Sequence, residues 1–261
     1  MERRRIGGET RPGNLDKDIN FGLLYGYYRG ADGKASAYPN GSLFKVHFLI
    51  PYVKAKFGPV SVEAEVQYGW GNIQMEDGVT GQDKEVRDLT AYVNAVVDLG
   101  PVYFGGTFAY LAGDDSTTTD KFEGGGNTSI NGGMDWNPCL IMFNQDITYT
   151  VGAIPGYGTT TNSSAMTNAW FGQGKIGGRP IAALDIQASL AYATADKKPT
   201  GVLNSAYGWE LDVTGTYKIT NNLSYMLGVG YLFTGDYYKG NSNNNAARNN
   251  YLLINKMTLT F

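Results

Sequence analysis

The feature that most constrains this chain is an alternation of apolar and polar residues, which is clearest over residues 250–261. There, Phe261, Leu259 and Met257 alternate with polar side chains. A period of two is typical of a β-strand with one apolar and one polar face. A soluble protein rarely leaves such a strand bare, whereas a closed membrane barrel has no free edge. If the chain is complete, this strand should pair with residues 19–27; if upstream strands are missing, the barrel closes in another register or stays open.

The same alternation recurs along the chain and predicts about ten strands in a single domain. The apolar phase slips by one residue at Pro51, which a β-bulge would explain. A turn is expected at residues 177–180. If residues 134–153 form a hairpin, the chain has about twelve strands instead of ten. Residues 1–16 are aperiodic and predict a flexible lead before a barrel over residues 17–261. The strands are expected over residues 19–27, 45–57, 60–70, 88–99, 102–110, 167–176, 184–192, 209–218, 225–233 and 250–261.

Two Gly-Pro pairs predict tight turns between neighbouring strands. Residues 57–60 and 99–102 share the form apolar-Gly-Pro-Val. Glycine at the first central position suits a two-residue type II′ hairpin, and proline is accepted at the second. If Phe57 lies opposite Val60, this register places Lys54 opposite Glu63 as a cross-strand ion pair. Short turns and long loops alternate along the chain, which predicts an up-and-down arrangement with an even number of strands.

Composition disfavours helical and nucleic-acid-binding proteins. Glycine occurs 36 times, and each glycine inside a helix costs about 1 kcal/mol, whereas the 19 tyrosines suit strands. No run of about 18 apolar residues is present, so a membrane-spanning helix is not expected. The net charge of -3, without a basic stripe, predicts no nucleic-acid partner. Residues 1–6 lack the apolar core of a secretion signal, so either a signal was removed or the chain is the C-terminal part of a longer protein.

Aromatic residues of the apolar face are predicted to gather at two heights. If the tight turns mark one end of the strands, one group falls at the opposite, loop end: Tyr25, Tyr27, Tyr68, Trp70, Tyr110, Trp170, Tyr192, Trp209, Tyr231, Phe233 and Tyr251. A second group falls at the turn end: Phe57, Tyr217, Tyr225 and Phe261. Two belts separated by small aliphatic residues match the two interfaces of a bilayer.

Alternating strands, Gly-Pro turns, two aromatic belts and a terminal phenylalanine together resemble the bacterial outer-membrane β-barrel porins. Residues 135–138 and 230–237 are similar to stretches of large porin-like proteins, which tend to be longer than this chain. The resemblance implies an all-β, transmembrane antiparallel up-and-down barrel in a Gram-negative outer membrane, with long extracellular loops and short periplasmic turns. It implies Phe261 as an insertion signal, with outer-membrane lipid and the barrel-insertion machinery as partners. Whether the protein is a homo-oligomer stays open.

Charged residues on the polar face are candidates for lining the lumen of the barrel. They are Lys45, His47, Lys54, Glu63, Glu65, Asp88, Asp98, Asp185, Glu210, Asp212, Lys218 and Lys256. In a water-filled lumen such residues set the local field and bias the passage of ions. The alternative is that they pair across strands and fill a narrow interior, because small barrels have little open lumen.

The apolar stretch over residues 134–143 is unusual for a surface loop. It begins near Asp135, Trp136, Asn137 and Pro138, which are candidates for a loop that folds inward and constricts the pore. An irregular strand pair or a contact between subunits would equally account for its apolar character.

Chemistry beyond passage of solutes has little support in the sequence. His47 is the single histidine and Cys139 the single cysteine, so neither a catalytic site nor a metal site built from these residue types is expected, and no cofactor is expected. The leading hypothesis is a non-enzymatic channel through which small hydrophilic solutes or ions diffuse passively. The alternative is a non-conducting barrel that acts as an anchor or adhesion scaffold through its extracellular loops.

Overall fold

A computed structural model of the protein describes residues 13–16, 18–32, 41–75, 82–124, 137–144 and 166–261 and shows an all-β fold. Two short strands, β1 (Gly13–Asp16) and β7 (Lys121–Phe122), and the 3-10 helix η1 (Asp236–Lys239) accompany ten long strands. The long strands are β2 (Ile19–Asp32), β3 (Ser42–Phe57), β4 (Val60–Met75), β5 (Lys84–Asp98), β6 (Val102–Leu111), β8 (Ala169–Ile181), β9 (Leu184–Thr194), β10 (Ala206–Lys218), β11 (Leu223–Thr234) and β12 (Asn250–Leu259).

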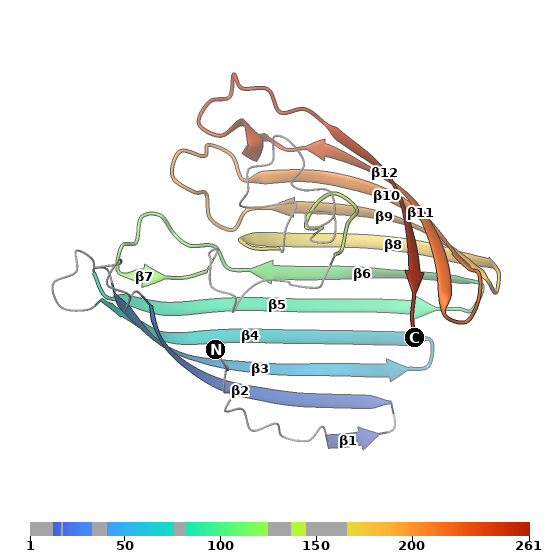
Figure 1. The fold of residues 1–261 in the computed structure, drawn as a ribbon, viewed down its shortest axis with the longest axis horizontal. Helices are drawn as coiled ribbons and strands as arrows, with labels where there is room; N and C mark the ends of the chain where they lie inside the picture. Colours follow the sequence, from blue (N-terminus) through green and yellow to red (C-terminus); the bar gives the residue numbers. More distant parts are fainter. Residues whose placement is uncertain (1–12, 17, 33–40, 76–81, 125–136, 145–165) are drawn as a thin grey trace.

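The long strands form one curved antiparallel sheet in which sequence neighbours are also spatial neighbours (Figure 1). This up-and-down order and the number of long strands confirm the predicted all-β, antiparallel up-and-down arrangement of about ten strands. Short β7 pairs in parallel with β5, off the main path. Gly13–Asp16 belong to the predicted flexible lead but form β1, which pairs with β2. Most of the possible hairpin at residues 134–153 lies outside the described residues.

The sheet is open, so the pairing of the last strand with residues 19–27, one of the two alternatives, is absent among the described residues. Its order runs from β1 to β12, and within the described residues β12 pairs only with β11. The second edge of β2 is occupied by β1, so β12 cannot pair with residues 19–21, which already face β1. Among the described residues no helix is long and apolar enough to cross a membrane.

The two predicted Gly-Pro turns are present. Gly58 has a φ of 58° and Gly100 a φ of 92°, which are backbone conformations that glycine adopts without a steric penalty. In the first hairpin Phe57 lies opposite Val60. That register places Lys54 opposite Glu63, and the Lys54 Nζ to Glu63 Oε1 distance is 3.3 Å. The predicted cross-strand ion pair is therefore confirmed.

Two predictions based on proline are wrong. The register is uniform through Pro51, which lies opposite Leu23, so β3 contains no bulge there. The apolar phase changes because Val46 is buried on the face of the sheet that also carries Lys54, here called the inner face; the opposite face is the outer face. Val46 packs there with Ile73 and Val86. Residues 177–180 do not form a turn, since β8 continues to Ile181, and its register shifts between residues 178 and 181. Pro180 therefore lies at an irregularity within the strand, a position that tolerates its missing N–H.

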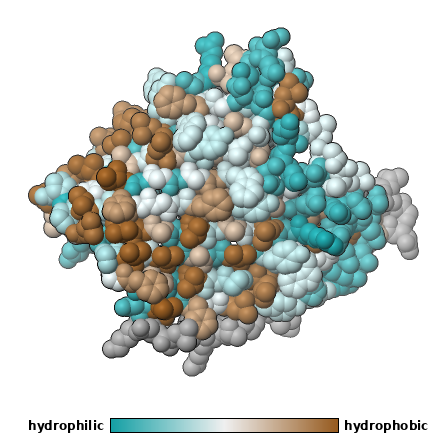
Figure 2. Space-filling model, turned by 180° about the vertical axis from the view of Figure 1, so that it is seen from behind, coloured by the Kyte–Doolittle hydropathy of each residue, from teal (hydrophilic) through white to brown (hydrophobic). Residues whose placement is uncertain are grey.

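The two faces of the sheet differ in chemistry. Exposed apolar side chains follow alternate positions on the outer face, as in Phe21, Leu23 and Tyr25 of β2. Seen from behind, apolar residues cover much of the strands, and hydrophilic residues gather toward the loop ends (Figure 2). On the inner face the largest cluster of buried apolar residues joins β6, β8, β9, β10 and β11 to the segment at residues 139–143.

Candidate functional site

Strand register assigns ten of the twelve lumen candidates to the inner face of the sheet. Lys54 faces Glu63, Glu63 faces Asn94 on β5, and the same parity carries across the sheet to β12. The ten inner-face candidates are Lys54, Glu63, Glu65, Asp88, Asp98, Asp185, Glu210, Asp212, Lys218 and Lys256.

Lys45 and His47 are on the outer face, so the prediction that they share a face with Lys54 is wrong. The physical reason is the absence of a bulge at Pro51, which keeps odd-numbered residues of β3 on one side. His47 stacks on Trp70 with 5.4 Å between ring centroids, and the Tyr25 hydroxyl lies 2.8 Å from its Nδ1.

The loop-end aromatic residues form contact groups on the outer face. Tyr68 stacks on Trp70 with 5.7 Å between the ring centroids, and the ring centroids of Tyr110 and Trp170 are 4.2 Å apart. Tyr192 and Trp209 are 4.7 Å apart on neighbouring strands. These groups of rings follow the loop end of the sheet, as predicted for one of the two aromatic groups.

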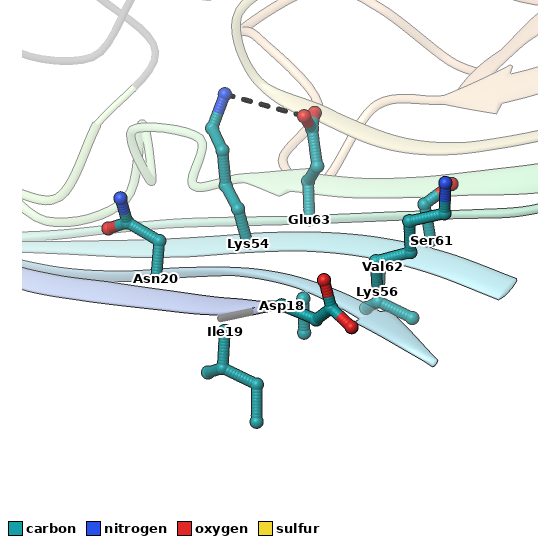
Figure 3. A pocket seen from close by; sticks show the side chains of 9 residues that line it. Asp18, Ile19, Asn20, Lys54, Lys56, Ser61, Val62 and Glu63 are labelled. Carbon is teal, nitrogen blue, oxygen red and sulfur yellow. Dashed lines mark ion pairs between the residues drawn. The ribbon is translucent and has the colours of Figure 1, made fainter. Parts of the chain in front are cut away.

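Near the turn end, the inner face of β2–β4 is polar and open to solvent. Figure 3 shows Asn20, Lys54 and Glu63 projecting from one side of these strands and Ile19 from the other. They border a shallow pocket of about 340 Å³. The side chains of Lys54 and Glu63 are 65% and 44% exposed, so the ion pair between them is screened by water.

An arginine that the sequence did not single out links three strands near the turn end. The Arg179 guanidinium lies 3.1 Å from Asp98 and 3.2 Å from Asp185. It also lies over the ring of Tyr103, whose hydroxyl donates to Asp185 Oδ1 at 2.7 Å. Arg179 lies within residues 177–180, where the sequence predicted a turn. Arg179 and Lys175 are both odd-numbered residues of β8 and therefore share a face of the sheet. This shared parity is the signal that could have assigned Arg179 to the inner face.

Residues 137–144, here called the inner segment, lie against the inner face of β8–β11 (Figure 1). The Leu140 N–H donates to Asp212 Oδ2 at 3.1 Å, and the N–H groups of Ile141 and Met142 donate to the two oxygens of Glu210 at 2.6 Å each. The two bonds to Glu210 are short for N–H donors.

Apolar contacts complete the attachment of the inner segment. Phe143 is fully buried, and its ring meets Phe171 and Tyr207 edge-on at 6.1 Å and 5.9 Å. Its φ of 55° is rare for a bulky residue and persists only where the surroundings impose it. Burial raises the pKa of the Cys139 thiol, and the charges of Glu210 and Asp212 raise it further.

The predicted constriction loop is described only in part. Asn137 and Pro138 begin the inner segment, and the Pro138 carbonyl accepts a hydrogen bond from Gln173 Nε2 at 2.6 Å. Asp135 and Trp136 lie outside the described residues. Glu210 and Asp212 were predicted to line a lumen, but the inner segment covers them, leaving exposed fractions of 1% and 5%.

Comparisons with known proteins found similarity only among solved structures. No protein-family model matches the chain, and no curated protein matches its sequence. The outer membrane channel DcaP of Acinetobacter baumannii aligns over 97% of this chain and 62% of its own, with 10% identity and a TM-score of 0.45. This chain thus spans less than two thirds of that channel.

Two further structures show the range of these likenesses. A BenF-like porin from Pseudomonas fluorescens aligns over 93% of this chain and 56% of its own, with 11% identity and a TM-score of 0.42. The outer membrane phospholipase A of Escherichia coli aligns over 98% of this chain and 81% of its own, with 14% identity and a TM-score of 0.35. The chain thus resembles outer-membrane proteins, among them channels and an enzyme, at TM-scores below 0.5.

Proposed function

We propose that the protein is an outer-membrane, porin-like channel for passive diffusion of small hydrophilic solutes or ions. The observation that carries this proposal is the opposite chemistry of the two faces of one sheet. The outer face presents exposed apolar side chains such as Leu211 and Val213, and the inner face presents charged ones such as Lys54 and Glu63. A sheet that separates lipid from water needs this arrangement.

The geometry suggests how passage is controlled. Exposed charges on the inner face of β2–β5 set the field along a water-filled path, and the inner segment narrows that path from the side of β8–β11. No bond is made or broken, so selectivity arises from size and charge. The open edges of the sheet must be paired in the membrane, because each unpaired backbone group in hydrocarbon costs several kcal/mol.

Single-channel recording tests this function. Purified protein reconstituted into a planar bilayer should give discrete conductance steps whose size scales with the salt concentration. Closure can be checked separately by comparing unheated and boiled samples on a detergent gel, where a closed barrel migrates differently before boiling. A bilayer that stays sealed after verified insertion would overturn the channel.

A non-conducting anchor or adhesion scaffold is the second candidate function. The buried cluster around Phe143, Phe171 and Tyr207 favours it, because it fills much of the inner face of β8–β11. In this case the extracellular loops would carry the interaction. Verified insertion without conductance, together with specific binding through the loops, would support the scaffold instead of the channel.

A further inference from the structure

Three buried side chains with metal-ligating atoms meet beneath the inner segment. They are Cys139 of the segment and Glu210 and Asp212 of β10, and their ligating atoms lie within 4.8 Å of one another. Their residues are only 3%, 1% and 5% exposed. The set combines one sulfur and two carboxyl groups, all from buried residues.

An independent observation points to a missing ligand at this cluster. Asp212 Oδ1 is buried and accepts no hydrogen bond from any described residue. Within the same part of the chain, no ion pair involves Glu210 or Asp212. Burying a carboxylate oxygen without a partner is costly. Two neighbouring buried carboxyl groups therefore need either a proton shared between them, which a side-chain hydrogen bond between Glu210 and Asp212 provides, or a bound cation.

The hydrogen bonds of the inner segment hold the carboxylates in position. Backbone N–H groups of residues 140–142 donate to Asp212 Oδ2 and to both oxygens of Glu210. A carboxylate oxygen has two lone pairs, so an oxygen that accepts one N–H can still bind a cation. At protein metal sites, hydrogen bonds that neighbouring groups make to the ligands hold those ligands in the right orientation. Asp212 Oδ1 is left with both lone pairs available.

We propose that Cys139, Glu210 and Asp212 bind one divalent cation of the Zn²⁺ class beneath the inner segment. The ligands are the Cys139 sulfur, one oxygen of Glu210 and Asp212 Oδ1, and water takes the fourth position of a tetrahedral site. A thiolate ligand favours Zn²⁺ over Mg²⁺ or Ca²⁺, which prefer oxygen. Binding forms a metal–sulfur bond and releases the thiol proton to solvent. The cation then links the inner segment to β10.

This site was not predicted because the sequence expectation considered only histidine and cysteine as metal ligands. One cysteine cannot form such a site alone, and nothing in the alternation pattern brings Cys139 to β10. The hydrogen bonds between the inner segment and β10 create the juxtaposition. The inference does not depend on whether the protein conducts.

Cobalt titration tests the proposal on the folded protein in detergent. After treatment with a chelator, Co²⁺ should bind at one equivalent and give a thiolate-to-metal absorption band in the near ultraviolet. Because Cys139 is the single cysteine of the chain, this band can report no other thiol. Zn²⁺ should displace the cobalt and remove the band. Absence of the band in folded wild-type protein would overturn the site and would leave a proton as the partner of Asp212 Oδ1.

Variants assign the ligands. Cys139→Ser should abolish the band, and Asp212→Asn, which conserves volume, should weaken Co²⁺ binding at least about tenfold. Glu63→Gln removes an inner-face carboxylate far from the site and should bind as the wild type does. Circular dichroism establishes that each variant is folded. Unchanged binding by folded Asp212→Asn would also overturn the proposal.

Discussion

The inner face of the sheet has two halves, and two pairs of charged residues, one in each half, differ in exposure and in role. On β2–β5, Lys54 and Glu63 form an exposed ion pair beside a shallow pocket. On β8–β11, Glu210 and Asp212 are buried and accept hydrogen bonds from the backbone of the inner segment. The contrast shows that the charges of Lys54 and Glu63 are open to water, whereas Glu210 and Asp212 hold the inner segment in place.

The largest difference between the halves should appear in side-chain packing. Phe143→Ala removes a fully buried ring from between Phe171 and Tyr207, and the cavity should cost about 4 kcal/mol of unfolding free energy. The matched change Phe108→Ala, on the outer face where the residue is 42% exposed, should cost about 1–2 kcal/mol. Equilibrium unfolding of the refolded protein in urea measures both. Equal losses would show that the inner segment does not pack as described.

Removal of a carboxylate should also affect the halves unequally. Glu210→Ala leaves the N–H groups of Ile141 and Met142 without their acceptor in a buried site, and we expect a loss of about 3 kcal/mol. Glu63→Ala breaks an exposed pair and should cost less than about 1 kcal/mol. Urea unfolding with chelator present isolates this effect from any bound cation. A larger loss for Glu63→Ala would reverse the assignment of the two halves.

The smallest expected effect concerns ion selectivity. If the protein conducts, Lys54→Glu should raise the cation-to-anion permeability ratio about twofold, since a charge in water interacts weakly with a passing ion. Lys45→Glu is the matched control, because Lys45 lies on the outer face and should leave the ratio unchanged. Reversal potentials in a salt gradient provide the measurement. An equal shift for both variants would mean that the two lysines face the same space.

Local pairing explains which parts of the structure could be predicted from the sequence. Alternation locates the long strands, and the turn at Gly58 sets the register that pairs Lys54 with Glu63. A two-residue turn leaves little freedom for the strands that it joins, so this contact follows from nearby residues.

Contacts between distant parts of the chain could not be derived in this way. The attachment of Ile141 to Glu210 depends on how an irregular segment folds back, and strand periodicity has no bearing on that choice. The error at Lys45 and His47 has a different origin. Val46 is apolar because it packs within the inner face near the loop end, so apolar character there does not mark the outer face.

Site-directed spin labelling tests most directly whether one sheet separates lipid from water. Single cysteines, introduced into a Cys139→Ser background over residues 61–68 of β4 and reconstituted in lipid, would be exposed to oxygen and to a water-soluble nickel relaxation agent. We predict strict alternation, with Val62, Ala64 and Val66 accessible to oxygen and Ser61, Glu63 and Glu65 accessible to nickel. Equal accessibility of both sets to the nickel agent would contradict a membrane-spanning sheet.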